Sequence, residues 1–169
     1  MEIREFTPDD LELYMQIRLE ALETNPDAFG STAEDFKRQS PDFHQRRLKN
    51  NYESADLVFL CALDENRPIG MIGVVRNTHA KNRHIATVIA VYVTPSARGQ
   101  GVGAKLMDAI IERGRGMARV EQLYLSVVSD NLPAIRLYQS RGFHRYGQAT
   151  RAKKWRGRYF DEDFMVLVF

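Results

Sequence analysis

Hydrophobic side chains recur at helical spacing through the first third of the chain. Thr7-Pro8 is typical of a helix start, and the apolar positions that follow predict a helix over residues 8–23. Ser31-x-x-Glu34 has the pattern of a capping box, and Ser40-Pro41 starts a helix again, so a second helical region is predicted over residues 31–51. The chain therefore opens with two helical regions.

From residue 57 onward the pattern changes to short β-rich runs. Residues 57–63 and 69–76 are separated by a polar turn, which predicts a hairpin. Residues 84–93 form the longest β-rich run, and its continuous apolarity from Val88 predicts a strand that is buried on both faces. We expect this strand at the centre of the sheet.

The second half of the chain alternates strands and helices. A glycine-containing loop over residues 94–103 leads into a helix that ends near Gly114 or Gly116. The remaining predictions are a strand over 121–128, a helix over 131–140, and strands over 143–148 and 163–168. A central β-α-β unit with flanking antiparallel hairpins predicts an α/β fold with a mixed, mostly antiparallel sheet and helices on its faces, in a single domain over residues 1–169.

The composition is that of a folded domain. Of the 169 residues 44% are hydrophobic and 27% are charged, which is enough apolar surface to bury a core. The longest apolar run, residues 85–93, is far shorter than the roughly 18 residues that a membrane span needs. The first 15 residues lack the basic and apolar regions of a signal peptide. We therefore expect a cytoplasmic protein with no membrane partner.

Cys61 is the only cysteine, which excludes an internal disulfide and any metal site built from several thiolates. We predict no metal ion. Because Cys61 lies within an apolar run, we interpret it as a core residue, with a reactive thiol as the alternative.

Charge is divided unevenly along the chain. Residues 1–84 carry 11 basic and 15 acidic side chains, whereas residues 85–169 carry 13 basic and 7 acidic ones. The second half therefore favours an anionic partner, although charge alone does not distinguish nucleic acid, a membrane surface and a phosphorylated small ligand.

A glycine motif follows the predicted central strand. Arg98-Gly99-Gln100-Gly101-Val102-Gly103 places three glycines at alternate positions before a helix start, where backbone amides and the helix dipole favour a phosphate. A plain strand-to-helix turn is the alternative. The Walker pattern is absent because Ala104 follows the last glycine, and the spacing departs from the dinucleotide fingerprint G-x-G-x-x-G.

This loop and a second motif resemble the GNAT acyltransferase superfamily. Arg98, Gly101 and Gly103 match the acyl-CoA loop [Q/R]-x-x-G-x-[G/A], which in that family follows a central strand. The second signature, an asparagine followed by A-x-x-x-Y-x-x-x-G-F, is present as Asn131 and residues 134–143. The resemblance covers residues 85–143, and the order of elements extends it over nearly the whole chain.

The resemblance implies that the chain binds acetyl-CoA as a co-substrate, with a CoA thioester of a longer acyl group as the alternative. The main chain of residues 91–93 would pair with the pantetheine arm, the amides of residues 98–103 would hold the pyrophosphate, and Asn131 would anchor the arm from the other side. The implied cofactor-binding residues are Val91, Tyr92, Val93, Arg98, Gly99, Gln100, Gly101, Val102, Gly103, Asn131 and Tyr138.

The resemblance also places Tyr138 beside the thioester as the catalytic residue. A phenol is a weaker acid than a thiol, so full proton donation to the departing sulfur is unfavourable. We therefore assign Tyr138 a hydrogen bond to the thiolate. The alternative is a tyrosine that only packs in the core.

The group that takes the proton from the amine is unassigned. Many family members place a glutamate early in the central strand, but residues 84–90 contain no carboxylate. His84, Tyr92 and a chain of water molecules are the candidates. The missing carboxylate mildly favours an acceptor amine of low pKa. An α-amine with a pKa of about 7.8 is neutral far more often at pH 7 than a lysine-like amine with a pKa of about 10.4.

The acceptor pocket should be formed by the first two helical regions and the last hairpin. We interpret Arg18 as a surface arginine that extends into solvent, with contact to the acceptor as the alternative. Residues 151–158 contain five basic side chains and no acidic one. We interpret them as a solvated hairpin tip, with a nucleic-acid or acidic-substrate contact through Trp155 as the alternative.

These features predict an acetyl-CoA-dependent N-acetyltransferase that acts on a small-molecule amine or on a peptide or protein N-terminus. The alternative is a non-catalytic acyl-CoA-binding regulatory domain, which the missing carboxylate favours. We expect no nucleic-acid partner, because no recognition motif accompanies the basic segment. Exposed strand ends are compatible with a homodimer.

Overall fold

The computed structural model describes residues 1–169 and contains one seven-stranded sheet with the strand order β1-β2-β3-β4-β5-β7-β6. Only β4 and β5 run parallel, and every other neighbouring pair is antiparallel. The strands are β1 (Glu2–Glu5), β2 (Leu57–Asp64), β3 (Arg67–Arg76), β4 (Ile85–Val93), β5 (Gln122–Val128), β6 (His144–Trp155) and β7 (Arg158–Val168). The predicted mixed, mostly antiparallel sheet is confirmed.

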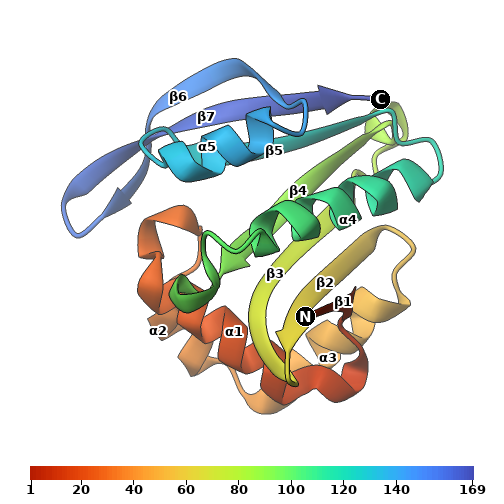
Figure 1. Ribbon diagram of the computed structural model, residues 1–169, viewed down its shortest axis with the longest axis vertical. Coiled ribbons are helices and arrows are strands. Elements are labelled where there is room, and N and C mark those ends of the chain that lie inside the picture. The colour runs from red at the N-terminus through yellow and green to blue at the C-terminus, as the bar shows by residue number, and fades with distance from the viewer.

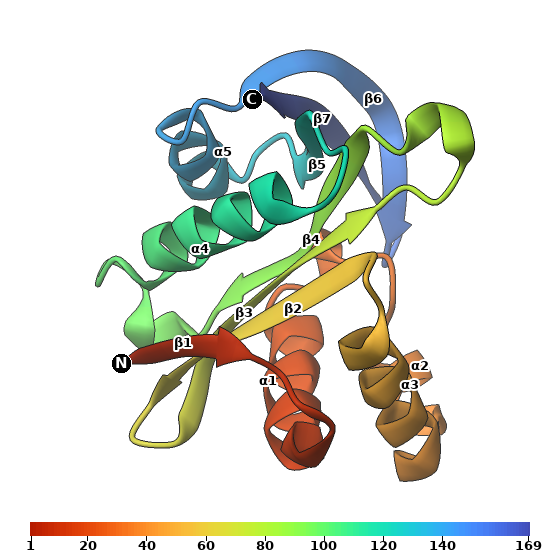
Figure 2. The ribbon, with the colours of Figure 1, turned by 90° about the vertical axis from the view of Figure 1, so that its right-hand side faces the viewer.

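Five α-helices cover the two faces of this sheet (Figures 1 and 2). They are α1 (Leu11–Thr24), α2 (Ala33–Arg38), α3 (Pro41–Glu53), α4 (Val102–Gly116) and α5 (Leu132–Gln139). Helices α1, α2 and α3 lie on one face, and α4 and α5 lie on the other (Figure 2). Four short 3₁₀ turns connect the elements, at Pro8–Asp10, Pro26–Ala28, Ala80–Asn82 and Pro95–Ala97.

The caps of the second helical region explain its division into α2 and α3. The hydroxyl of Thr32 accepts a hydrogen bond from the amide of Asp35 at the start of α2, one residue later than the predicted Ser31 cap. The hydroxyl of Ser40 then accepts a bond from the amide of Phe43 and starts α3, as predicted. The two helices therefore begin at separate caps.

Alternation along the central strands divides the interior into two cores. Leu60 and Ala62 of β2 face α4 and join the larger apolar cluster, whereas Phe59 and Cys61 face α1 and join the smaller one. Cys61 is fully buried, and burial raises the pKa of its thiol to about 11. The prediction that Cys61 is a core residue is confirmed.

Two predictions about the sheet edges were wrong. The short strand β1 was missed because its four residues are mostly polar, although it pairs with β2 along the register Glu2↔Leu63. The last two strands are longer than predicted. Strand β6 extends beyond residue 148 to Trp155, and β7 already begins at Arg158, before residue 163, so that only a two-residue turn separates them. The basic segment 151–158 therefore belongs mainly to the paired hairpin.

The central strand β4 departs from the prediction of burial on both faces. It pairs with β5 only from Ile85↔Gln122 to Thr87↔Tyr124, after which the two strands separate (Figure 1). A bulge follows, because the register against β3 shifts and Ala90 has a positive φ of 55°. Ile89 is consequently 36% exposed. The separation opens the interior of the molecule at the middle of the sheet.

Candidate active site

Two adjoining cavities lie where β4 and β5 separate. One has a volume of about 430 Å³ and is lined by the glycine loop, and the other has a volume of about 440 Å³ and is lined by α1, α3 and β7. We call them the loop cavity and the helix cavity. Both are lined by Ala28, Phe29, Val91, Asn131 and Tyr138. These five residues mark the junction between the two cavities.

The loop cavity brings together ten of the eleven predicted cofactor-binding residues. They are Val91, Tyr92, Val93, Arg98, Gly99, Gly101, Val102, Gly103, Asn131 and Tyr138. The exception is Gln100, whose side-chain amide donates to the carbonyl of Ser96 at 2.9 Å outside this cavity. The two sequence motifs, although separated along the chain, therefore converge on one cavity.

The backbone of the glycine loop is shaped for close approach by a ligand. Gly99 has a φ of 76° and Gly101 a φ of 81°, a region in which L side chains are strained. A Cβ atom added at either glycine would meet nothing within 4 Å, so backbone conformation rather than crowding requires glycine here. Helix α4 begins at Val102, and the amides of its first turn, together with the positive end of the helix dipole, favour an anion at this end of the helix.

The side chain of Arg98 braces this loop. Its Nε donates to the carbonyl of Val93 at 3.0 Å, and a terminal nitrogen donates to Oδ1 of Asn25 at 2.7 Å. The guanidinium also lies 5.8 Å from the ring centre of Tyr92. These contacts hold the loop against the end of β4.

Tyr138 lies at the junction of the two cavities. It projects from α5, is 5% exposed, and packs against Phe143 with the ring centres 6.2 Å apart. Burial alone raises the pKa of its phenol, with no hydrogen bond from the chain contributing to the shift. The hydroxyl is therefore neutral near pH 7 and able to donate. Asn131 caps the same helix by accepting from the amide of Ala134 at 3.3 Å.

Neither of the two side chains suggested from the sequence as proton acceptor suits that role. His84 precedes β4 and lines neither cavity, because it lies where β4 and β5 are still paired. The hydroxyl of Tyr92 donates to Oε1 of Glu20 at 2.9 Å, and burial raises the pKa of Tyr92. His84 is thus outside the cavities, and the hydroxyl of Tyr92 is already engaged by Glu20.

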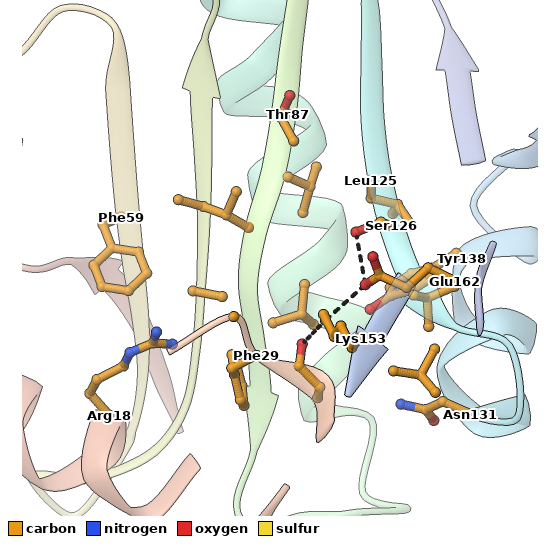
Figure 3. A pocket seen from close by; sticks show the side chains of 18 of the residues that line it. Arg18, Phe29, Phe59, Thr87, Leu125, Ser126, Asn131, Tyr138, Lys153 and Glu162 are labelled. Carbon is orange, nitrogen blue, oxygen red and sulfur yellow. Dashed lines mark hydrogen bonds and ion pairs between the residues drawn. The ribbon is translucent and has the colours of Figure 1, made fainter. Parts of the chain in front are cut away.

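The structure instead brings a carboxylate into the helix cavity from β7. Glu162 lines this cavity beside Ser126, whose hydroxyl donates to Oε1 of Glu162 at 3.4 Å (Figure 3). Nζ of Lys153 forms an ion pair with the same carboxylate at 2.8 Å and also donates to the carbonyl of Ala28 at 3.2 Å. The side chain of Glu162 is only 13% exposed. Glu162 was missed from the sequence because the carboxylate was sought only in residues 84–90 of the central strand.

The opposite wall of the helix cavity carries Arg18, and this corrects the prediction of a solvent-exposed arginine. Its guanidinium lies over the ring of Phe29, 4.8 Å from the ring centre, and faces the cavity (Figure 3). Its Nη1 atom is buried and has no hydrogen-bond partner. Burial lowers the pKa of Arg18, and the nearby charge of Arg47 acts in the same direction.

The basic segment 151–158 contributes one residue, Lys153, to the helix cavity. Its other cations lie against aromatic rings of the same hairpin, as Arg151 does over Tyr159 at 5.0 Å and Arg156 over Trp155 at 5.5 Å. This arrangement agrees with the interpretation of a solvated hairpin. No group of three or more His, Cys, Asp or Glu side chains is placed to hold a metal ion. No helix is both long and apolar enough to cross a membrane.

Comparison with known proteins gives a consistent family. The family model described as "Acetyltransferase (GNAT) family" matches residues 19–143. A mycothiol acetyltransferase from Brachybacterium faecium is 28% identical over 146 residues, which are 85% of this chain and 40% of that protein. The chain spans less than half of the length of the first curated relatives that it matches.

Solved structures agree over the whole chain. A ribosomal-protein-alanine N-acetyltransferase from Brucella melitensis superposes with a TM-score of 0.86 at 25% identity and covers 100% of both chains. A phosphinothricin acetyltransferase from Sinorhizobium meliloti, determined in complex with AcCoA, has a TM-score of 0.84 at 21% identity and covers 99% of this chain and 87% of that one.

Proposed function

The chain belongs to the GNAT acetyltransferase family, and on that premise we propose that it transfers the acetyl group of acetyl-CoA to a primary amine of a small molecule or of a peptide or protein N-terminus. One observation carries the proposal. The loop cavity and the helix cavity meet at Tyr138, so a thioester entering from one side and an amine entering from the other would meet beside the same phenol.

The residues of the loop cavity fit acetyl-CoA, which when bound would supply the activated acetyl group. The open backbone at Gly99 and Gly101 and the start of α4 would hold the pyrophosphate. The separated edge of β4 at Val91 and Val93 leaves main-chain groups to pair with an extended amide-containing arm. Asn131 lines the same cavity and would hold the arm from the other side.

The helix cavity would hold the amine, and Glu162 is our candidate for its proton acceptor. As the new C–N bond forms and the C–S bond breaks, the proton of the amine would pass to the carboxylate of Glu162. The hydroxyl of Tyr138 would donate a hydrogen bond to the departing thiolate sulfur. Since burial raises the pKa of Tyr138 further above that of a thiol, this hydrogen bond stays short of full proton transfer.

Glu162 changes two inferences that depended on a missing carboxylate. The strand 84–90 indeed has none, but β7 supplies one to the same cavity. The preference for an amine of low pKa therefore loses its basis. The non-catalytic acyl-CoA-binding domain loses the feature that favoured it, so we retain catalysis as the proposal.

A thiol-release assay with a panel of amines tests this function. Acetyl-CoA would be incubated with the protein and with amino acids, polyamines and short peptides, and free CoA thiol would be followed by its reaction with a chromogenic disulfide. Amine-dependent release and a matching mass increase of 42 Da in the acceptor, the mass of an added acetyl group, would support the proposal. Calorimetric binding of acetyl-CoA without release on any amine would instead identify an acyl-CoA-binding module.

A further inference from the structure

The helix cavity contains a cationic group with no partner. Arg18 reaches this cavity from α1, and its Nη1 atom is buried without a hydrogen bond. Phe29 contacts the guanidinium through its ring face at 4.8 Å, which offers no acceptor for the N–H groups. Burying an unpaired guanidinium is unfavourable, so such groups usually have an anionic partner.

The chain itself offers no anion to Arg18. The nearest acidic residues along α1 are engaged elsewhere, since Glu20 accepts from Tyr92 and Glu23 pairs with Lys37 at 2.5 Å. Across the cavity, Glu162 is paired with Lys153. Arg18 forms no ion pair within the chain, so an anionic partner would come from outside it.

A second arginine strengthens this positive wall. Arg47 of α3 also lines the helix cavity, lies close enough to lower the pKa of Arg18, and has no ion pair of its own. Of the charged side chains that line this cavity, Arg18, Arg47 and Lys153 are basic and Glu162 is acidic, so the cavity carries a net positive charge. An amine acceptor with no anionic group would be repelled by that charge.

From these observations, and resting on the proposed function, we propose that the acceptor is a small amino acid or related amine whose carboxylate binds Arg18 and Arg47. The planar fork of a guanidinium matches a carboxylate through two parallel hydrogen bonds. In Figure 3, Arg18 lies on the side of Phe29 opposite to Glu162 and Tyr138. A molecule in this cavity would thus direct its carboxylate to the arginines and its amine to the junction.

Matched acceptors test the proposal. L-methionine and L-methioninamide differ in the carboxylate alone, and 3-(methylthio)propylamine lacks the group altogether. For each, kcat/KM would be measured by thiol release and corrected for the fraction of neutral amine, because the three amines differ in pKa. Since one ion-paired hydrogen bond contributes enough to change an equilibrium by about 10- to 100-fold, we expect wild type to prefer the carboxylate by that factor.

Two variants assign the preference to the cavity. Arg18→Met should raise KM for the amino acid by about 10- to 100-fold and leave kcat/KM for the amide and the affinity for acetyl-CoA within about 3-fold. Arg46→Met is the matched control, because it removes the same charge at an exposed position of helix α3 that does not line the cavity, and it should leave the preference intact. Arg18→Lys should retain part of the preference.

The outcomes separate this inference from the function on which it rests. Equal use of the amino acid and the amide by wild type would overturn the carboxylate site alone. An equal loss on both acceptors in Arg18→Met, with a lowered melting temperature, would reduce Arg18 to a packing role and overturn it too. Failure of every amine to release thiol would overturn the proposed function and the inference with it.

Discussion

Replacing Tyr138 by phenylalanine separates catalysis from folding, because the change removes one oxygen atom and leaves the ring. The hydroxyl has no hydrogen-bond partner in the chain, so its loss breaks no contact that stabilises the fold. The ring keeps its packing against Phe143. We therefore expect the free energy of unfolding to change by less than about 1 kcal/mol, and to rise if the hydroxyl is poorly hydrated in the free protein.

The effect on rate should be much larger. A hydrogen bond to a charged acceptor contributes about 1.5–3 kcal/mol, and a factor of ten in rate corresponds to about 1.4 kcal/mol. The loss of the hydrogen bond from Tyr138 to the departing sulfur should thus lower the chemical rate by about 10- to 150-fold. Affinity for acetyl-CoA should change little, since the sulfur gains its negative charge only as the bond breaks.

The assay is a single turnover of acetyl-CoA with protein in excess, which measures the chemical step even where product release limits kcat. Chromogenic detection of thiol has no background from the folded protein, because Cys61 is fully buried and its pKa is raised to about 11. Tyr124→Phe is the matched control, since Tyr124 lies on β5, packs against Tyr146 with the two rings tilted by 39°, and lines neither cavity.

A single-turnover rate for Tyr138→Phe within about 2-fold of wild type would refute the assigned role of the phenol. An equal loss in Tyr124→Phe would show that the assay responds to general perturbation. A fall in rate accompanied by weaker acetyl-CoA binding would place the hydroxyl in ground-state binding rather than in departure of the thiolate.

Three further predictions follow from particular residues. Glu162→Gln should lower kcat/KM at pH 7 by about 100-fold or more, and pH profiles should show the deficit narrowing at high pH, where more of the amine is already neutral; a constant deficit would argue against proton transfer. Gly101→Ala should destabilise the protein by about 1–2 kcal/mol in urea unfolding because of its positive φ, and should weaken acetyl-CoA binding in calorimetry, whereas Gly116→Ala, at an unstrained position with nothing within 4 Å, should do neither. The two hydrogen bonds that Arg4 donates to Asp10 at 2.6 and 2.7 Å lower the pKa of Asp10 to about 2. The ion pair therefore stabilises the fold fully above about pH 4, and this contribution is lost as the pH falls towards 2. The difference in melting temperature between wild type and Asp10→Asn should vanish over that range.

The cofactor half of the candidate site could be predicted from the sequence because its parts are local. The strand end, the glycine loop and the helix start are consecutive, so residues 91–103 specify the loop without knowledge of the rest of the fold. The second motif needs only one more assumption, that β5 follows α4 back to a place beside β4. The individual residues came from the GNAT resemblance, and ten of the eleven that it implied line one cavity.

The fold was predicted less well where long-range pairing decides the structure. Strand β1 is too short and polar to be recognised alone, and it exists because β2 presents an edge to it. The continuous apolarity of β4 suggested burial on both faces, but β5 leaves β4 after Thr87 and exposes Ile89. No local pattern in either strand records that separation, since it depends on how both pack against their other neighbours.

The acceptor half is assembled from segments that are distant along the chain, and this explains why its chemistry was missed. Arg18 comes from α1 and Glu162 from β7, and they share a cavity only because β5, which pairs with β7, turns away from β4. From the sequence, Arg18 was interpreted as a surface cation, and nothing drew attention to Glu162. The same separation of strands that would admit the proposed thioester to Tyr138 thus brings the two opposite charges to the walls of one cavity. A carboxylate-bearing amine could contact both, because its amine would be drawn to Glu162 and its carboxylate to Arg18.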